Sequence, residues 1–166
     1  MLNQFINLFW TFLAFMPVVW YWYLRDAGIV ILFYVIVSVA VGFLPARFFA
    51  KLQLSKSRRA YERLGVRFIA QFVQDGSFSN RISGRKLISR STIKDEKKLS
   101  SYLKTLSMYE RYHMECLVFF MITVIDSLFQ GLLIFSFIVL VLNIIYNFYP
   151  IILQQYNRLR VKGIVV

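Results

Sequence analysis

The longest apolar stretch of this chain, residues 116–153, most constrains what the chain can fold into. As a single helix it would measure about 57 Å, almost twice the roughly 30 Å hydrocarbon core of a bilayer. A natural break is offered by the polar or flexible residues Asp126, Ser127, Gln130 and Gly131. We therefore expect two membrane segments here, at about residues 115–129 and 132–152.

Two further apolar runs lie near the amino terminus, at about residues 5–24 and 29–44. The first is long enough to cross a bilayer, and it ends in an aromatic belt, residues 20–23, of the kind found at headgroup level. The second is somewhat short and closes at Pro45. The intervening polar turn at Arg25-Asp26 predicts that the two runs form a membrane hairpin.

The charged residues avoid these runs, as the cost of a charge inside the hydrocarbon requires. The chain has 166 residues, of which 58% are hydrophobic, and a formal net charge of +12. Residues 46–112 hold 16 of the 20 Lys and Arg against 5 Asp and Glu, and the tail holds three more basic residues. Because basic loops stay in the cytosol, we expect both termini and this loop on the cytosolic side. The predicted fold is an all-α integral membrane protein, a single domain of residues 1–166 with four transmembrane segments as two hairpins.

The basic loop, residues 46–112, shows partial helical spacing over residues 47–69, a turn at 75–80 and a helix over 94–112 that runs on into the third segment. Its Lys and Arg pairs lack the interleaved aromatic residues and the motifs of a nucleic-acid site. The composition favours an amphipathic loop that binds membrane lipids through their anionic headgroups, and no nucleic acid.

The chain has one cysteine and one histidine, which exclude an intrachain disulfide, a paired CxxC motif and a multi-histidine metal site. We expect no metal and no cofactor. The densest cluster of reactive side chains is residues 109–115, where Glu110 and His113 share one helical face and Arg111 and Glu115 share another. A carboxylate beside an imidazole suits a general base that takes a proton from a hydroxyl. The alternative is charge pairing where a helix enters the membrane.

A second cluster lies in the tail and comprises Tyr156, Asn157, Arg158 and Arg160. Its arginines suit a phosphate or a carboxylate, and the alternative is a basic membrane anchor. Asn143 and Asn147, one turn apart at membrane depth, line an interior face, and hydrogen bonding between helices is their default role.

These motifs resemble the glycosyl-diaponeurosporenoate acyltransferase family, small bacterial membrane proteins of carotenoid (staphyloxanthin-type) synthesis. Its members end in an asparagine, a proline, an apolar run and Gln-Arg-Tyr-Asn-Arg-Pro-Arg, which Asn147, Pro150 and residues 151–160 resemble. Glu110 and Glu115 match the two glutamates of an upstream family element. The likeness is good over residues 99–161, faint at 61–65 and only topological in the first fifty residues. The His-Trp pair that follows the family's second glutamate is replaced here by Val118 and Phe119.

The resemblance implies an acyltransferase of the bacterial cytoplasmic membrane that esterifies a hydroxyl of a glycolipid or glycosylated carotenoid. In that hypothesis Glu110, His113 and Glu115 are catalytic. The expected substrate-binding residues are Arg111, Asn147, Tyr156, Asn157, Arg158 and Arg160. The missing His-Trp pair leaves a second hypothesis, a non-catalytic structural or assembly subunit of a larger membrane complex. A conducting oligomer has little support, because few polar residues lie at membrane depth.

Overall fold

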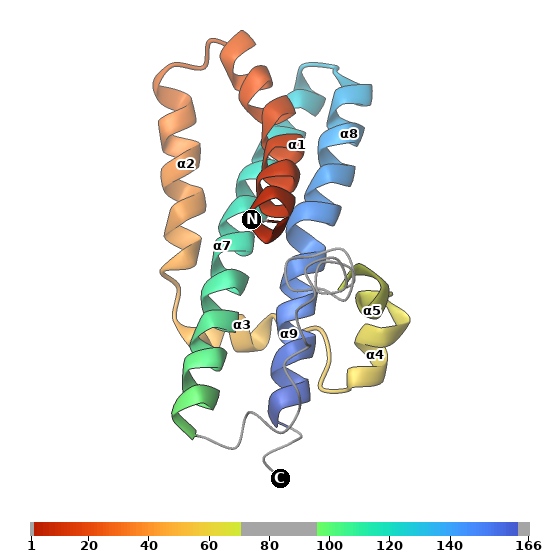
Figure 1. Ribbon diagram of the computed structural model, residues 1–166. Coiled ribbons are helices and arrows are strands. Elements are labelled where there is room, and N and C mark those ends of the chain that lie inside the picture. Colours follow the sequence, from red (N-terminus) through yellow and green to blue (C-terminus); the bar gives the residue numbers. More distant parts are fainter. Residues whose placement is uncertain (1, 71–95, 163–166) are drawn as a thin grey trace.

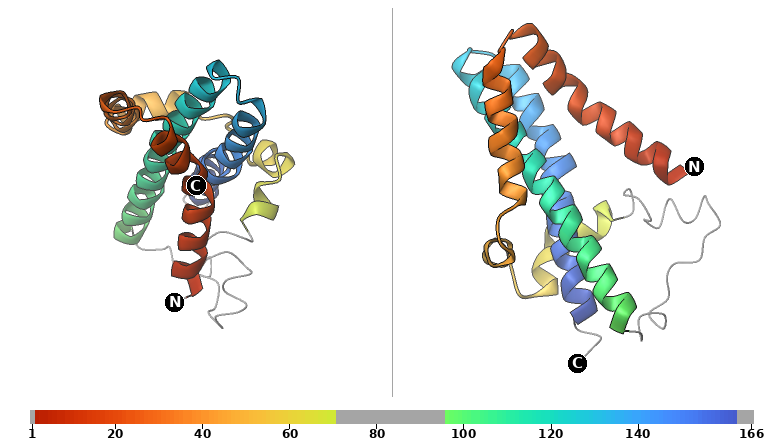
Figure 2. Two further views of the ribbon diagram at one scale, coloured as in Figure 1. Left: turned by 90° about the horizontal axis from the view of Figure 1, so that it is seen from above. Right: turned by 90° about the vertical axis from the view of Figure 1, so that its left-hand side faces the viewer.

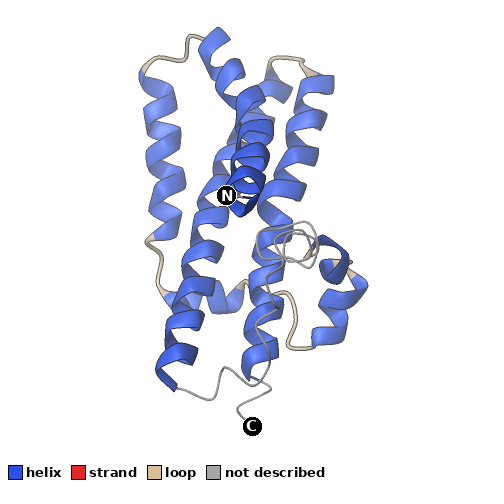
Figure 3. Cartoon of the chain, in the orientation of Figure 1, coloured by secondary structure: helices blue, strands red, loops and turns tan. Residues whose placement is uncertain are grey.

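The computed structural model describes residues 2–70 and 96–162, and every element of regular structure within these ranges is helical (Figures 1 and 3). The order of elements is α1 (Leu2–Leu24), α2 (Ile29–Gly42), α3 (Ala46–Lys51), α4 (Arg58–Arg63), α5 (Val66–Ile69), α7 (Glu96–Phe129), α8 (Leu133–Asn143), the π-helix η2 (Ile144–Phe148) and α9 (Tyr149–Lys162). The all-α class predicted from the sequence is therefore confirmed. The predicted turn at residues 75–80 lies outside the described residues.

The long apolar stretch divides where its polar residues predict. Helix α7 ends at Phe129, and Gly131 has a φ of 74°, a left-handed conformation that glycine adopts without steric cost. The helix expected over 94–112 begins at Glu96 and continues without interruption into the third apolar segment. After the turn, α8, η2 and α9 form one helical column that runs antiparallel to α7 (Figure 1). The basic tail is the last part of this column.

The first two helices follow the expected boundaries closely, with α2 ending two residues earlier than predicted. They are joined by a short turn, but they do not lie side by side along their length. Helix α2 packs on α7, whereas α1 leans away from α2 and packs on α8 and η2 (Figure 2). The predicted first hairpin is thus correct in connectivity and wrong in packing, since the partner of each helix is chosen by side-chain fit.

A polar contact fastens the end of α1 to α7. The indole Nε1 of Trp22 donates to Thr123 Oγ1 over 2.9 Å, and Tyr21 donates its hydroxyl proton to the Asp126 carboxylate. Arg25 pairs with the same carboxylate at 3.3 Å. Trp22 and Tyr21 also belong to the main apolar core, together with Val18, Phe120, Val124 and Val139.

The segment between α2 and residue 70 forms three short helices rather than one. Helices α4 and α5 lie against α9, where Tyr61 and Val66 join Ile152, Leu153 and Tyr156 in a second core (Figure 1). Gly65 links the two helices with a φ of 76°, a backbone conformation that a residue with a side chain rarely adopts. Tyr61 and Val66 therefore make the packing against α9, whereas the apolar residues at helical spacing in this segment are exposed: Phe48, Leu52, Leu64 and Phe68.

Two stretches are long and apolar enough to cross a membrane, Leu99–Phe129 and Leu133–Val161, judged by length and composition over the described residues. Helix α2 has 14 residues, about 21 Å at 1.5 Å per residue, which is shorter than a bilayer core. Helix α1, with 23 residues, has sufficient length. Large apolar side chains on α1, α2 and α8 face outward, among them Phe33, Ile29 and Ile134.

Candidate functional site

Glu110 is the most deeply buried charged side chain of α7, with a relative exposure of 1%. It faces α9, where Arg158 forms an ion pair with its Oε2 atom and Gln155 Nε2 donates to its Oε1 atom over 3.0 Å. The Arg158 side chain is itself 17% exposed. Taking such a pair out of water is costly, and extra hydrogen bonds to both partners offset that cost. Both carboxylate oxygens of Glu110 are thereby engaged.

Gln155 joins this ion pair to the segment that precedes α4. Its Oε1 atom accepts from the backbone N–H of Leu54 at 3.2 Å and from the hydroxyl of Tyr61 at 3.0 Å. Its Nε2 atom also donates to the Leu52 carbonyl at 3.4 Å. Tyr61 is fully buried, and burial raises the pKa of its hydroxyl above the usual value, so the hydroxyl keeps its proton and remains a donor. We call Glu110, Gln155, Arg158 and Tyr61 the carboxylate cluster.

Tyr156 adds a second link between α9 and α4. Its hydroxyl donates to Glu62 Oε1 over 3.0 Å, and its ring belongs to the second apolar core. Arg67 and Arg160 lie near enough to act electrostatically on Tyr156, and Arg160 is exposed. This end of the molecule therefore combines a buried, paired core with exposed positive charge around it.

Arg111 and Glu115, predicted to share a helical face, both contact the end of α2. The Arg111 guanidinium donates to the carbonyls of Leu44, at 2.7 Å, and Gly42, and it lies 4.5 Å above the Phe49 ring. The Glu115 carboxylate lies against Gly42, where a Cβ atom would be only 1.6 Å from Oε1. Arg111 thus caps the carbonyl end of a helix, which is a favourable place for a cation. The structure gives this pair a role in packing α2 onto α7.

His113 lies about one turn after Glu110 on α7 and faces η2. Its ring makes edge contacts with Tyr146, at 5.7 Å between centroids, and with Tyr112, at 5.2 Å. The imidazole is close enough to interact with the side chain of Asn147 and the backbone of Tyr146. Its Nδ1 atom is buried and makes no hydrogen bond to the described residues. Glu110 and His113 therefore do not form the expected pair, and each has its own set of partners.

Asn143 and Asn147 line the same side of the helical column. Asn143 Nδ2 donates to the Leu117 carbonyl of α7 at 3.2 Å, and Asn147 Nδ2 donates to Asn143 Oδ1 at 2.8 Å. Both side chains are buried, which agrees with the expected bonding between helices. Tyr146, next to them, bonds Thr11 of α1 at 2.8 Å. We call His113, Tyr146, Asn143 and Asn147 the imidazole cluster.

The structure thus brings four of the predicted site residues to the interface of α7 with η2 and α9: Glu110, His113, Asn147 and Arg158. Tyr156, also on α9, faces α4. Arg111 and Glu115 lie against α2, Arg160 is exposed, and Asn157 is half-buried on α9. Sequence reasoning gave no role to Gln155 and Tyr61. Gln155 lies in the tail element that carried the family resemblance, and Tyr61 lies in residues 61–65, where the likeness is faint.

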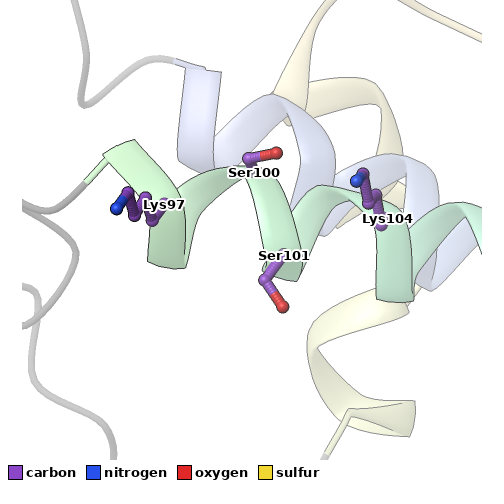
Figure 4. Close-up of a pocket in the computed structure, with 4 residues that line it drawn as sticks. All are labelled: Lys97, Ser100, Ser101 and Lys104. Atoms are coloured by element: carbon purple, nitrogen blue, oxygen red, sulfur yellow. The ribbon is translucent and has the colours of Figure 1, made fainter.

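A shallow surface hollow is lined by Lys97, Ser100, Ser101 and Lys104, all on the first turns of α7 (Figure 4). Lys104 precedes Glu110 by six residues, about 9 Å along a helix. A hollow made by one exposed helix face encloses no substrate, so we do not assign the chemistry to it. Within the described residues, no group of three or more His, Cys, Asp or Glu side chains is placed to hold a metal ion.

Residues 45–166 match the sequence model of the glycosyl-4,4'-diaponeurosporenoate acyltransferase family. The match spans most of the chain and includes both polar clusters, so the chain belongs to this family. The first 44 residues, with α1 and α2, lie outside the match. Searches of curated proteins and of solved structures returned no significant match.

Proposed function

We propose that this member of the glycosyl-4,4'-diaponeurosporenoate acyltransferase family transfers an acyl chain to a hydroxyl of a glycosylated carotenoid or related glycolipid. The family match over residues 45–166 carries the proposal. It is supported by the presence of an imidazole beside a buried asparagine within the matched region. An acyl transfer of this kind needs a base for the hydroxyl and a binding place for the activated donor.

In the proposed reaction, His113 accepts the proton of the acceptor hydroxyl as its oxygen attacks the donor's acyl carbon. The bond from that carbon to the donor's leaving group then breaks, and the leaving group takes the proton from the imidazolium. The products are the ester and the protonated leaving group of the thioester or ester donor. A positioned general base contributes about 10²- to 10⁴-fold to such a step.

The carboxylate cluster has a different part in this proposal. Glu110 is held by Arg158 and Gln155, so its lone pairs are less available to a substrate than those of an unpaired carboxylate. We assign to it the alignment of α7 with α9. Arg160 and Arg67, near Tyr156 at the same end, are the proposed contacts for an anionic group of the donor.

The proposal places the protein in the bacterial cytoplasmic membrane as a multi-pass protein, with α1 and α2 crossing beside the two longer segments. Residues 46–112 and the tail then lie at the cytosolic face. There each Lys or Arg side chain near the surface adds about 1 kcal/mol of attraction to anionic headgroups. A lipid acceptor would reach the imidazole cluster from the bilayer. Both termini are cytosolic in this arrangement.

Mass spectrometry of total lipids tests the proposed activity. Cells lacking the gene are complemented with wild type, His113→Gln, Glu110→Gln or the control Tyr23→Phe, which alters a side chain that is 75% exposed. We expect wild type and the control to restore an acylated glycolipid, and His113→Gln to leave its unacylated precursor. An unchanged lipid profile on loss of the gene contradicts the proposal, provided the protein is expressed in the complemented strain.

One observation favours the alternative of a non-catalytic subunit. The family's His-Trp pair is absent, and Phe119, at the tryptophan position, stacks against Trp22 with 6.4 Å between centroids. A subunit of this kind co-purifies with stoichiometric partners, and His113→Gln leaves its function intact. Affinity purification in mild detergent distinguishes the two cases.

A further inference from the structure

Two buried side-chain polar atoms lack a hydrogen-bond partner within the described part of the chain, and they belong to adjacent residues of one cluster. They are His113 Nδ1 on α7 and Asn147 Oδ1 on η2, the π-helical turn above α9 in Figure 1. Leaving a buried polar group unpaired is energetically unfavourable, so such an atom calls for an explanation. The chemistry of their neighbours determines what each atom must do.

The orientation of the Asn147 amide follows from the hydrogen bonds beneath it. A backbone carbonyl only accepts, so the group that Asn143 turns toward Leu117 must be its NH₂. Its Oδ1 atom therefore faces Asn147, and Asn147 must donate its own NH₂ to it. Asn147 Oδ1 is left as an acceptor on the side of His113. Because Asn147 is fully buried, water does not compete for this atom.

A second acceptor is the carbonyl of Tyr146, which Pro150 leaves without its usual helical donor. In a regular α-helix the carbonyl of Tyr146 would accept from residue 150, and proline has no N–H to donate. The proline ring also clashes with that carbonyl, which accounts for the widened π-helical turn at Ile144–Phe148. The backbone of Tyr146 lies close enough to His113 to interact with it. The imidazole therefore meets two acceptors, the Tyr146 carbonyl and Asn147 Oδ1.

We infer that Asn147, oriented by Asn143, fixes His113 in the tautomer that carries its proton on Nδ1 and leaves Nε2 as the proton acceptor. Nδ1 is the ring nitrogen that is buried without a partner among the described residues, so it is stabilised when it is protonated and donates to one of these acceptors, and in a neutral imidazole the other nitrogen then has the free lone pair. Asn147 is thus a positioning residue. The catalytic half of this inference rests on the proposed function, whereas the tautomer itself does not.

The consequence for the reaction concerns the direction of proton transfer. The lone pair of Nε2 accepts the proton of the acceptor hydroxyl, and the Nδ1 proton stays between His113 and Asn147 throughout. The positive charge that appears on the ring is stabilised by the Asn147 and Tyr146 oxygens. In the other tautomer, Nε2 carries a proton and cannot act as a base, so an enzyme without Asn147 loses the reactive form for part of the time.

The single histidine of the chain makes the tautomer directly measurable. We would label the protein with ¹⁵N-histidine, place it in lipid nanodiscs and record the two imidazole nitrogen resonances. We expect wild type to show a protonated Nδ1 and an unprotonated Nε2, and Asn147→Leu to gain a population with the proton on Nε2. The control Ser136→Ala, which removes a buried hydroxyl further up the same column, keeps the wild-type spectrum.

A wild-type spectrum with the proton mainly on Nε2 overturns the inference, and this result needs no variant to fold. A spectrum of Asn147→Leu identical to wild type overturns the role of Asn147. In a nanodisc acyl-transfer assay, Asn147→Leu should lower kcat and leave KM within about 3-fold, since the substrate contacts remain. If the tautomer is as inferred and no acyl transfer occurs, the proposed function fails while the tautomer assignment stands.

Discussion

The two polar clusters of α7 begin only three residues apart, yet they differ in how completely their groups are paired. In the carboxylate cluster, both oxygens of Glu110 and both amide atoms of Gln155 have partners. In the imidazole cluster, His113 Nδ1 and Asn147 Oδ1 have no hydrogen-bond partner among the residues that the structure describes. A saturated cluster stabilises a fold, whereas in the imidazole cluster the inferred tautomer pairs the two unpartnered atoms with each other and leaves Nε2 of His113 as a proton acceptor. The comparison separates a structural role from a chemical one on a single helix.

The largest expected effect on stability comes from breaking the Glu110–Arg158 pair. Arg158→Leu leaves a carboxylate at 1% exposure without its cation, and we expect a loss of about 3–5 kcal/mol in the free energy of unfolding. Titration with a denaturing detergent, followed by circular dichroism, measures it. The exposed Arg160→Leu serves as control, with a change of about 0.5 kcal/mol or less. Equal losses for the two variants would mean that the Glu110–Arg158 ion pair adds no more stability than an exposed arginine does.

The hydroxyl of Tyr61 tests the outer edge of the carboxylate cluster. Tyr61→Phe removes the hydrogen bond that the hydroxyl donates to Gln155 Oε1 and the one that it accepts from the Ser55 N–H, and we expect a loss of about 1–2 kcal/mol. Gln155 Oε1 keeps the Leu54 N–H, which limits the effect. The same detergent titration measures it, with Tyr23→Phe as control because Tyr23 is exposed. A loss as small as that of Tyr23→Phe would show that Gln155 does not depend on Tyr61.

Arg25→Ala examines a polar contact outside both clusters, at the opposite end of α7. The Arg25 side chain is 42% exposed, so its pair with Asp126 should contribute little, and Arg25→Ala should destabilise the protein far less than Arg158→Leu. Stability measured in low and in high salt checks this, since an exposed pair weakens as salt rises. A loss comparable to that of Arg158→Leu would contradict the assumed exposure of this end.

Among these variants, Pro150→Ala should change the free energy of unfolding least and the tautomer of His113 in the imidazole cluster most. The variant supplies an N–H for the Tyr146 carbonyl, so we expect a net change within about 1 kcal/mol, together with a more regular helix. Competition for that carbonyl should shift the His113 tautomer, and the nitrogen spectrum of the single histidine records it. If the spectrum stays unchanged, the proline has no part in orienting the imidazole.

The sequence determined much of the fold before any contact was known. The uncharged runs and the break at Gln130-Gly131 indicated the helical class, the ends of α1 and α7 and the start of α8, because apolar length and flexible residues act locally. The elements around Glu110 and Tyr156 also gave the family, which the match over residues 45–166 confirms. Periodicity placed Glu110 and His113 on one face of a helix.

Only the tertiary structure decided which partners those residues have. The bonds of Gln155 to Glu110 and to Tyr61 join positions 45 and 94 residues apart, and no local pattern encodes such a distance. The same holds for α1, which packs on α8 and η2 although it directly precedes α2 in the chain. Helical spacing fixes the face on which a side chain lies. The residue that meets that face depends on how whole helices fit together. Here that fit places Arg158 beside Glu110 and Asn147 beside His113.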